Sequence, residues 1–369
     1  MRCGWCGAVS GPVAVAEPSL RVLLVAPVST GGIGAHVRDL AGGLRARGHH
    51  VTVAAPAATI EAFALAEAAD RAVAVPVGTA NVAAFGALRR LARAADVVHA
   101  HGVRAGAVTG LAAARVPVVV TWHNAPLGGP VRRAVHAGLE RMSARLADLV
   151  LVASADLLDR AQHAGARQAV LAPVAAPSAP VVAPAASVDL RAAANGRSVV
   201  ICIARLHRQK RIDVLVHALA GQSELHAFVA GDGPLRGELD RLIAATGAPV
   251  TLLGHVQAAA ALYRQADLAV LPSEWEARPL AVQEALRAGV PTVCTDVGGV
   301  PDLVGPAAVV VAPGDPAALR AALLDLARDG ARRDALAVAG PQQAATWPTV
   351  DNTVDIVENN YLNLYQRHR

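Results

Sequence analysis

Short apolar runs alternate with helix-like segments along most of the chain, and this alternation constrains the fold more than any other feature. Each run has four to six residues and is rich in Val, Leu, Ile and Ala, which is typical of strands buried on both faces. Strands separated by helical segments form parallel, doubly wound sheets. The sequence therefore predicts an α/β protein. The strand candidates are Val22–Pro27, Val51–Ala55, Ala72–Val77, Val97–Ala100, Val118–Thr121, Leu149–Ala153, Ser198–Ile203, Ala227–Ala230, Val250–Leu253, Leu268–Leu271, Thr292–Thr295 and Val309–Ala312.

The alternation is interrupted once, in the uncharged stretch Gln168–Val188, which contains four prolines. So many prolines rule out a membrane-spanning helix there and favour an interdomain linker. A chain of 369 residues is long for one core and suits two domains. We expect a disordered leader over residues 1–20, a first domain over 21–172, a linker over 173–190, a second domain over 191–348, and a helix over 349–369 that crosses back to the first domain.

The four cysteines give no disulfide framework for a protein of this size. Cys202 and Cys294 lie in strand-like apolar runs, where we expect inert core residues. Cys3 and Cys6 form a lone C-x2-C, and no second pair follows that would complete a zinc site. The N-terminus lacks an apolar segment of the length that a secretion signal needs, so we expect a cytoplasmic protein.

The basic residues are concentrated in the first half of the chain. Residues 1–180 hold 17 Lys and Arg against 10 Asp and Glu, whereas residues 181–369 hold 17 against 19. Such a surface suits transient contact with an anionic membrane, here the inner face of the plasma membrane, or with a phosphorylated acceptor. With three Tyr and three Phe, a base-stacking platform is not expected, and neither is a nucleic-acid partner.

Two carboxylates, Glu276 and Glu284, stand where a strand gives way to a helix. Leu268–Leu271 reads as the buried strand, Pro279 suits the first turn of the helix, and Gly289 ends it. Glu276 then lies in the loop and Glu284 about one turn into the helix. The N–H groups at a helix start bind phosphate, while carboxylates nearby accept hydrogen bonds from sugar hydroxyls. The segment predicts a site for a nucleotide sugar.

The only lysine of the sequence, Lys210, follows an apolar strand five positions after Arg205. An ammonium group is a compact point charge and a guanidinium is a planar fork, so together they could hold a diphosphate from two sides. A lysine retained by chance on a solvated face is the alternative. Its position after a strand and upstream of the two glutamates favours the diphosphate site.

Glycine-rich turns follow three of the predicted strands. Gly31 and Gly32 open a helix, where backbone N–H groups can approach a phosphate or sugar closely, although a plain helix-start turn has the same composition. The second strand ends at Pro56 without an acidic residue for an adenosine ribose, which disfavours a nicotinamide dehydrogenase. The turn beginning at Gly231 leads into a helix that we expect to begin at Pro234. We expect it to line a nucleoside pocket together with His255 and Val256.

Three of the 13 histidines stand at predicted strand ends. His123 is the candidate catalytic histidine, because an imidazole at a strand end can donate to a sugar hydroxyl or phosphate. His99 and His101 alternate along a strand and could face one side as metal ligands. They lack a companion carboxylate or cysteine at a suitable spacing, so we expect structural or acceptor-pocket histidines and no metal site.

Together these segments resemble the retaining glycosyltransferases of the GT-B fold, family four, over residues 21–365. The resemblance implies two doubly wound Rossmann-like domains that face each other across a cleft. It also implies that Glu284 holds the nucleotide ribose, that Glu276 contacts the donor sugar, and that His123 lies close to the transferred sugar. The blocks that carry it are the Gly31-Gly32 loop, the pair Arg205 and Lys210, the turn Gly231-Asp232-Gly233-Pro234, and the E-x7-E spacing of Glu276 and Glu284.

The chain departs from the family pattern at Glu276-Ala-Arg-Pro279, where members often read Glu-Gly-Phe-Gly. Pro279 removes one backbone N–H that would have met phosphate. The N–H groups of Leu280 and Ala281 would serve instead, with Arg278 compensating.

The resemblance implies transfer of a hexosyl unit from a nucleotide diphosphate sugar to the hydroxyl of a carbohydrate or lipid-linked acceptor, with retention and without metal or cofactor. The acceptor would be a glycolipid, a polysaccharide or a small-molecule glycoside. A sugar-nucleotide 2-epimerase shares this architecture but needs further acid and base carboxylates in the first domain. A nucleotide-sugar-binding protein without catalysis is the non-enzyme alternative.

Overall fold

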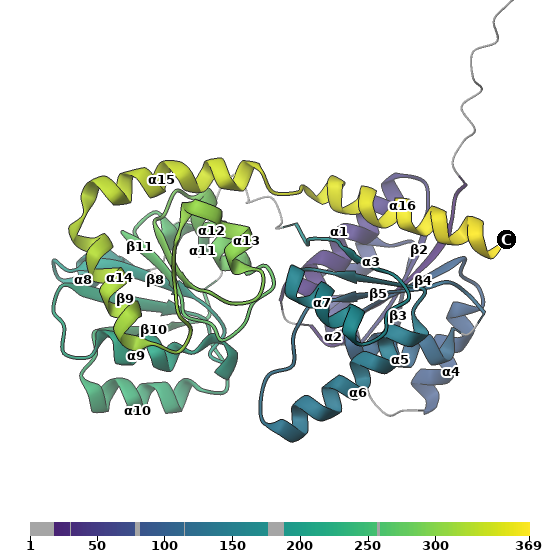
Figure 1. Cartoon of the computed structure of the whole chain (residues 1–369), viewed down its shortest axis with the longest axis horizontal. Helices are drawn as coiled ribbons and strands as arrows, with labels where there is room; N and C mark the ends of the chain where they lie inside the picture. Colours follow the sequence, from purple (N-terminus) through teal and green to yellow (C-terminus); the bar gives the residue numbers. More distant parts are fainter. Residues whose placement is uncertain (1–17, 30, 78–81, 114, 176–187, 257–258) are drawn as a thin grey trace, which may run out of the picture.

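The computed structural model describes the chain except for residues 1–17, 30, 78–81, 114, 176–187 and 257–258. The described residues form two α/β domains that lie side by side along the long axis of the molecule (Figure 1). Residues 1–17 of the predicted leader, which include Cys3 and Cys6, and most of the predicted linker lie outside the described residues, whereas Leu20 is buried in the first domain. No helix in the described ranges is both long and apolar enough to cross a membrane.

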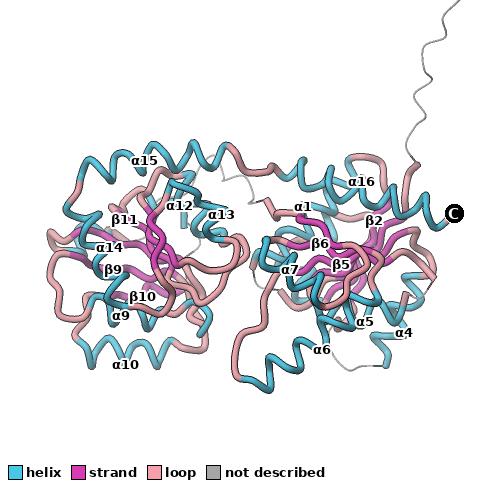
Figure 2. The backbone as a smooth tube through the Cα atoms, in the orientation of Figure 1, coloured by secondary structure: helices cyan, strands magenta, loops and turns pink. Residues whose placement is uncertain are grey.

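The first domain is built on a seven-stranded parallel sheet with the order β3-β2-β1-β4-β5-β6-β7. Its helices lie on both faces of the sheet (Figure 2), so the inner strands are buried as their apolar sequences require, whereas the two edge strands are only partly covered. The strands are β1 (Arg21–Val25), β2 (His50–Ala55), β3 (Arg71–Ala74), β4 (Val97–His101), β5 (Val118–Trp122), β6 (Leu149–Val152) and β7 (Ala169–Leu171). The helices are α1 (Gly32–Ala46), α2 (Ala57–Ala62), α3 (Leu65–Ala68), α4 (Val82–Ala92), α5 (Val103–Ala112), α6 (Pro130–Leu146) and α7 (Ala155–His163).

The second domain has a six-stranded parallel sheet with the order β10-β9-β8-β11-β12-β13. Its strands are β8 (Ser198–Ile203), β9 (Leu225–Ala230), β10 (Val250–Gly254), β11 (Leu268–Leu271), β12 (Thr292–Thr295) and β13 (Val309–Val311). The helical segments are α8 (Leu190–Ala194), η1 (Arg208–Lys210), α9 (Ile212–Leu219), α10 (Arg236–Thr246), α11 (Ala259–Tyr263), α12 (Leu280–Arg287), α13 (Val300–Val304), η2 (Gly305–Ala307), α14 (Pro316–Arg328) and α15 (Gly330–Ala345).

Both sheets reverse their strand order once, between β1 and β4 in the first and between β8 and β11 in the second. In doubly wound sheets, ligands bind outside the carboxyl ends of the strands at this reversal, because the helices on either side diverge there. The predicted doubly wound Rossmann-like architecture is confirmed for both domains.

The last helix, α16 (Val350–His368), crosses back and packs on α1 (Figure 1). Its start is fixed by a capping box, in which Thr349 and Asn352 each accept a hydrogen bond from the other's backbone N–H. Gly43 of α1 allows the close approach, since a Cβ atom there would lie 2.5 Å from Val354 Cγ2. Glu358 of α16 also pairs with Arg47, so this helix is part of the first domain although it ends the chain.

Two local predictions were wrong. The strand β7 is missing from the predicted strands: Ala169–Leu171, at the end of the predicted first domain, pairs with β6 as an edge strand. A three-residue edge strand in an uncharged stretch has no periodicity of its own to reveal it. The helix after Gly231 begins at Arg236 and not at Pro234, because Pro234 belongs to the turn that precedes it.

Candidate donor-binding cavity

A cavity of about 690 Å³ lies between the two domains, and the carboxyl ends of strands from both sheets open onto it. Every residue predicted for the site lines it except Gly31, which immediately precedes the lining residue Gly32 as the N-cap of α1. The predicted residues that line the cavity are Gly32, His123, Arg205, Lys210, Gly231, His255, Val256, Glu276, Leu280, Ala281 and Glu284. They come from both domains, so the cavity is complete only when the domains are docked.

Two glycines pack against the backbone of the loop that carries Glu276. Gly298 has a φ of +52°, and a Cβ atom there would lie 2.1 Å from the carbonyl oxygen of Glu276. Gly299 donates its N–H to the same oxygen at 2.9 Å. A side chain at position 298 would push the Glu276 backbone toward the cavity, so this glycine fixes where the carboxylate stands.

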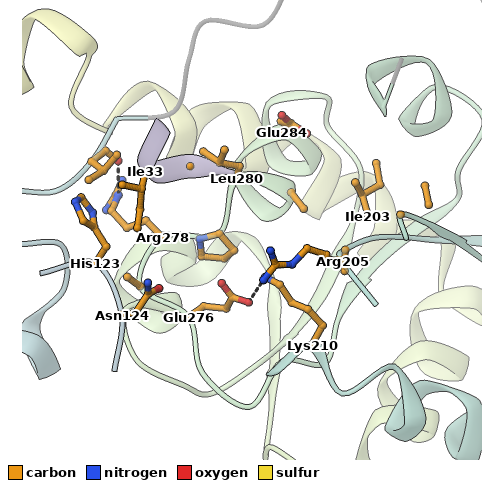
Figure 3. Close-up of a pocket in the computed structure, with 18 of the residues that line it drawn as sticks. Ile33, His123, Asn124, Ile203, Arg205, Lys210, Glu276, Arg278, Leu280 and Glu284 are labelled. Carbon is orange, nitrogen blue, oxygen red and sulfur yellow. Dashed lines mark hydrogen bonds and ion pairs between the residues drawn. The ribbon is translucent and has the colours of Figure 1, made fainter. Parts of the chain in front are cut away.

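Lys210 reaches Glu276 from η1, and the two side chains form an ion pair (Figure 3). Gln209 holds η1 against the Glu276 loop. Its side-chain amide donates to the Trp275 carbonyl oxygen at 2.8 Å, and its backbone carbonyl accepts from Glu274 N–H at 2.8 Å. Arg205 lines the cavity on the same side as Lys210 (Figure 3). The predicted pair of unlike cations is therefore assembled next to the predicted sugar-binding carboxylate.

Glu284 lies on α12, whose first residues Leu280 and Ala281 also line the cavity. Pro279 stands just before the helix, so the first N–H groups of α12 belong to Leu280 and Ala281, which have no intrahelical acceptor at a helix start. Burial raises the pKa of Glu284, and the nearby Arg287 opposes this rise. The carboxyl group is thus partly desolvated, as suits a hydrogen-bond acceptor for hydroxyl groups.

The turn at Gly231 packs closely on the strand end that precedes Arg205. Gly231 has a φ of +143°, and a Cβ atom there would lie 2.0 Å from the Ala204 carbonyl oxygen. Its N–H donates to the Gly254 carbonyl at 2.7 Å, which brings His255 and Val256 to the same rim. Only glycine fits at position 231, so the close packing of the backbone is enough to explain this glycine. The same close packing keeps the turn at the wall of the cavity, where a ligand can bind.

Four histidines cluster at the first-domain wall of the cavity. His101 Nδ1 lies 3.2 Å from His123 Nε2, and His36 of α1 is edge-on to both rings, with centroids 5.3 and 5.5 Å away. His99 lies behind them, with Nδ1 2.6 Å from the Tyr361 hydroxyl and Nε2 2.6 Å from Thr121 Oγ1. His123 is thus the histidine that reaches the cavity, and His99 is a structural residue.

Burial lowers the pKa of all four imidazoles, to about 4 for His36 and to about 3 for His99, and well below the usual value for His101 and His123. They are neutral at physiological pH, so each can donate from one nitrogen and accept at the other. Ligating nitrogens of His36, His101 and His123 lie within 4.8 Å of one another. A tetrahedral zinc site needs its nitrogens roughly 3.4 Å apart, and the 3.2 Å between His101 Nδ1 and His123 Nε2 is close to that spacing.

Sequence reasoning missed three contributors to this region. His36 lies on α1, and its spacing there gives no hint that it meets strand-end histidines. Asn124 lines the cavity directly after His123. Trp275 is buried between the domains, a position that no periodicity of a loop can reveal.

Two family models match the chain in succession. The first, described as a glycosyl transferase 4-like domain, matches residues 31–177. The second, described as glycosyl transferases group 1, matches residues 197–329. The boundary between them falls where the two described domains meet.

Curated relatives agree with these models. The chain is 30% identical to a sulfoquinovosyl transferase of Arabidopsis thaliana and 34% identical to a GDP-mannose-dependent alpha-mannosyltransferase of Mycolicibacterium smegmatis, over 57% and 42% of its length. These matches span 44% and 41% of the two relatives, which is less than half of each. A glycogen synthase of Mycobacterium tuberculosis is 29% identical over 90% of this chain and 92% of its own.

Solved structures share the two-domain fold. The Anabaena protein HepE in complex with UDP-glucose superposes with a TM-score of 0.78 at 20% identity, covering 92% of this chain and 99% of its own. A sucrose-phosphate synthase from Thermosynechococcus elongatus gives 0.77 at 20% identity, covering 94% and 100%. Similarity at this level of identity establishes the fold alone. With its two parallel-sheet domains, the interdomain cavity and both family matches, this chain belongs to the group 1 glycosyl transferases and has the GT-B fold.

Proposed function

We propose that this protein is a retaining, metal-independent glycosyltransferase that moves a hexosyl unit from a nucleotide diphosphate sugar to an acceptor hydroxyl. The observation that carries the proposal is the convergence of Arg205, Lys210, Glu276 and Glu284 on one cavity between the domains. These four residues span 80 positions of sequence, yet they meet beside the N-terminus of α12. Cations, carboxylates and helix N–H groups are the partners that a diphosphate, sugar hydroxyls and a ribose require.

The difficult step is departure of the nucleoside diphosphate, whose negative charge grows as the glycosidic bond breaks. Arg205, Lys210 and the α12 N-terminus would stabilise that charge. Lys210 already has Glu276 as its counterion. A bound donor would therefore place its phosphates near Lys210 and its sugar hydroxyls near Glu276. The ion pair would then lie at the junction between the leaving diphosphate and the sugar.

Retention follows in this proposal from attack on the face that the leaving group vacates. The carboxylates in the described lining are Asp232, Glu276 and Glu284. Asp232 accepts a hydrogen bond from Gly233 N–H at 2.8 Å in its turn, Glu276 is paired with Lys210, and Glu284 lies on α12 at the ribose position implied by the family resemblance. We assign none of the three as a covalent nucleophile. In this proposal the departing phosphate takes the proton of the acceptor hydroxyl. His123, as a neutral imidazole, forms a hydrogen bond with the transferred sugar.

Two observations bear on the donor and the acceptor. The relatives named above include mannosyl and sulfoquinovosyl transferases, and HepE was solved with UDP-glucose, which supports a hexosyl donor linked to a nucleoside diphosphate. The acceptor side is formed by the first domain, whose basic excess supports an anionic or lipid-linked acceptor. Transient contact with an anionic membrane stays a prediction.

The 2-epimerase alternative fits the cavity less well. It needs acid and base carboxylates from the first domain, whereas the described first-domain lining consists of Gly32, Ile33, His123, Asn124, Ala153 and Val174. Consumption of the nucleotide sugar without any acceptor would favour the epimerase. Tight donor binding without transfer or hydrolysis would favour a binding protein that lacks catalysis.

Incubating the protein with UDP-, GDP- and ADP-sugars and following nucleotide release by mass spectrometry tests the proposal. We expect release from at least one donor and a loss of about 100-fold or more in the Lys210→Ala variant, because a charge-assisted contact to the leaving group is removed. Unchanged turnover of every donor by Lys210→Ala would contradict the proposal. Arg208→Ala, an exposed cation in the same η1 segment, serves as the matched control.

A further inference from the structure

Arg278 is a cavity-lining cation that the proposed chemistry does not use. It lies two residues after Glu276, and its side chain extends to the first domain, where Nε donates to the Val174 carbonyl oxygen at 3.2 Å. In Figure 3 it reaches toward His123, while Arg205 and Lys210 lie on the other side of Glu276. Arg278 is therefore well separated from the two cations assigned to the diphosphate.

The guanidinium of Arg278 lacks a counterion within the described part of the chain. None of the ion pairs there involves Arg278, and its buried Nη2 has no hydrogen-bond acceptor. Burial lowers the pKa of Arg278 to about 10, Arg287 adds to this effect, and Asp302 opposes it. Arg160, which is also partly buried, pairs with the carboxylate of Glu140.

A partly buried cation without an anion is costly, because water is removed and no charge replaces it. The single bond to Val174 could be made by a neutral amide, so holding the domains together does not by itself require a guanidinium. An anion that arrives with a substrate would supply the missing charge, and a turn of the Arg278 side chain would bring the guanidinium into contact with it. The position beside His123 places that anion near the sugar to be transferred and not near the diphosphate.

We propose that Arg278 binds an anionic substituent, a carboxylate, sulfonate or phosphate, on one of the two carbohydrates that meet at the reacting end of the cavity. The inference rests on the proposed glycosyltransferase function and narrows it to an acidic donor sugar or an acidic acceptor. Such a contact makes Arg278 a specificity-determining residue, because the neutral counterpart of the same sugar leaves the guanidinium unpaired.

Matched pairs of substrates distinguish the two sources of the anion. The donor arm compares UDP-glucose with UDP-glucuronate, and the GDP and ADP analogues where those nucleotides are accepted. The acceptor arm compares an alkyl glucoside with the corresponding glucuronide and with the glucoside 6-phosphate. The readout is the ratio of kcat/KM for the acidic and the neutral member, with each KM determined separately.

We expect the wild-type protein to favour the acidic member of one arm by about 10- to 100-fold, as for one charge-assisted contact. Arg278→Gln should bring this ratio close to one, and Arg278→Lys should leave an intermediate ratio, because the charge is kept and the fork is lost. Arg90→Gln, which removes an exposed cation on α4, should leave the ratio unchanged. Circular dichroism and nucleotide binding by calorimetry verify that each variant is folded.

A neutral preference of the wild-type protein in both arms would overturn the inference. So would an equal loss of rate on acidic and neutral substrates in Arg278→Gln, since Arg278 would then only hold the domains together. In both cases nucleotide release still occurs and the proposed function stands. If the wild-type protein releases nucleotide from no donor and binds none, the proposed function fails and this inference fails with it.

Discussion

The indole Nε1 of Trp275 donates a hydrogen bond of 2.7 Å to Oδ2 of Asp156, and this bond joins the two domains. Trp275 belongs to the second-domain loop that carries Glu276, and Asp156 lies in the first turn of α7. Asp156 also accepts from Ser154 Oγ at 2.5 Å. The tryptophan ring and the neighbouring Ala277 pack into the core cluster of the first domain. The Glu276 loop is thus held by both domains.

Replacing Asp156 should weaken this junction. Asp156→Ala leaves a buried indole N–H without an acceptor, which costs about 1 to 3 kcal/mol, and we expect this loss in the free energy of unfolding. Donor turnover should fall as well, because the Glu276 loop loses its support from the first domain. Urea unfolding and nucleotide release measure the two effects. Asp159→Ala on the same helix is the control, since Asp159 is exposed, and an equal loss in both variants would argue against the junction.

Glu284 should act through donor binding. In the proposal, Glu284 accepts hydrogen bonds from the nucleotide ribose. A hydrogen bond to a charged acceptor contributes about 1.5 to 3 kcal/mol. We therefore expect Glu284→Gln to raise KM for the nucleotide sugar by roughly 10- to 100-fold and to change kcat little. Steady-state kinetics on one donor measure this. Glu274→Gln, an exposed carboxylate in the adjacent loop, should leave KM as it is. A fall in kcat alone for Glu284→Gln would assign Glu284 to the chemical step instead.

A methyl group at position 298 should disturb the site without touching any ligand. In Gly298→Ala the new Cβ atom would lie 2.1 Å from the Glu276 carbonyl, at a φ of +52° that side chains rarely adopt. We expect a loss of about 1 to 3 kcal/mol in unfolding free energy and a large loss of turnover. Gly237→Ala is the matched control, because no atom lies within 4 Å of a Cβ atom there and alanine favours the helix interior. Full activity in Gly298→Ala would show that Glu276 does not depend on this contact.

Much of the fold could be predicted because parallel strands buried on both faces leave a direct signal in the sequence. Ser198–Ile203, Leu268–Leu271 and Thr292–Thr295 have the predicted bounds as β8, β11 and β12, since each is a continuous apolar run between polar or helical segments. The edge strand β7 has no such signal. It is three residues long and pairs with a neighbour on one side only, so its sequence is free to resemble the linker that follows.

The site could be predicted where a residue type is set by its own backbone position. Gly231 fits because nothing larger would, and Glu276 and Glu284 have a fixed spacing around a helix start. Contacts between distant segments could not be predicted in the same way. Trp275 meets Asp156, and His36 meets His101, only after the sheets form and the domains dock. Such pairings depend on tertiary packing and have no local pattern.

The buried histidines should make the protein less stable as the pH falls from 7.5 to 5. Burial lowers the pKa of His36 from 6.5 to about 4, so between these values the unfolded chain binds more protons than the folded protein. The unfolding free energy therefore decreases as the pH falls below 6.5, by about 2 kcal/mol at pH 5 for His36 alone. Above about pH 7.5 both states are almost entirely neutral at this residue and its contribution does not change. Urea unfolding at several pH values between 5 and 7.5 measures the slope.

A variant comparison isolates this residue from other titrating groups. Glu284 contributes with the opposite sign, because burial raises its pKa, but its contribution cancels when wild type is compared with a variant. His36→Asn should therefore show a smaller decrease between pH 7.5 and pH 5 than the wild-type protein, whereas His50→Asn, at an exposed position, should show the wild-type decrease. Equal slopes in all three proteins would mean that His36 is protonated in the folded state at pH 5. The neutral state assigned to His36 would then be wrong, whereas His123 would stay neutral, because a charged imidazole at His36 lowers the pKa of its neighbours.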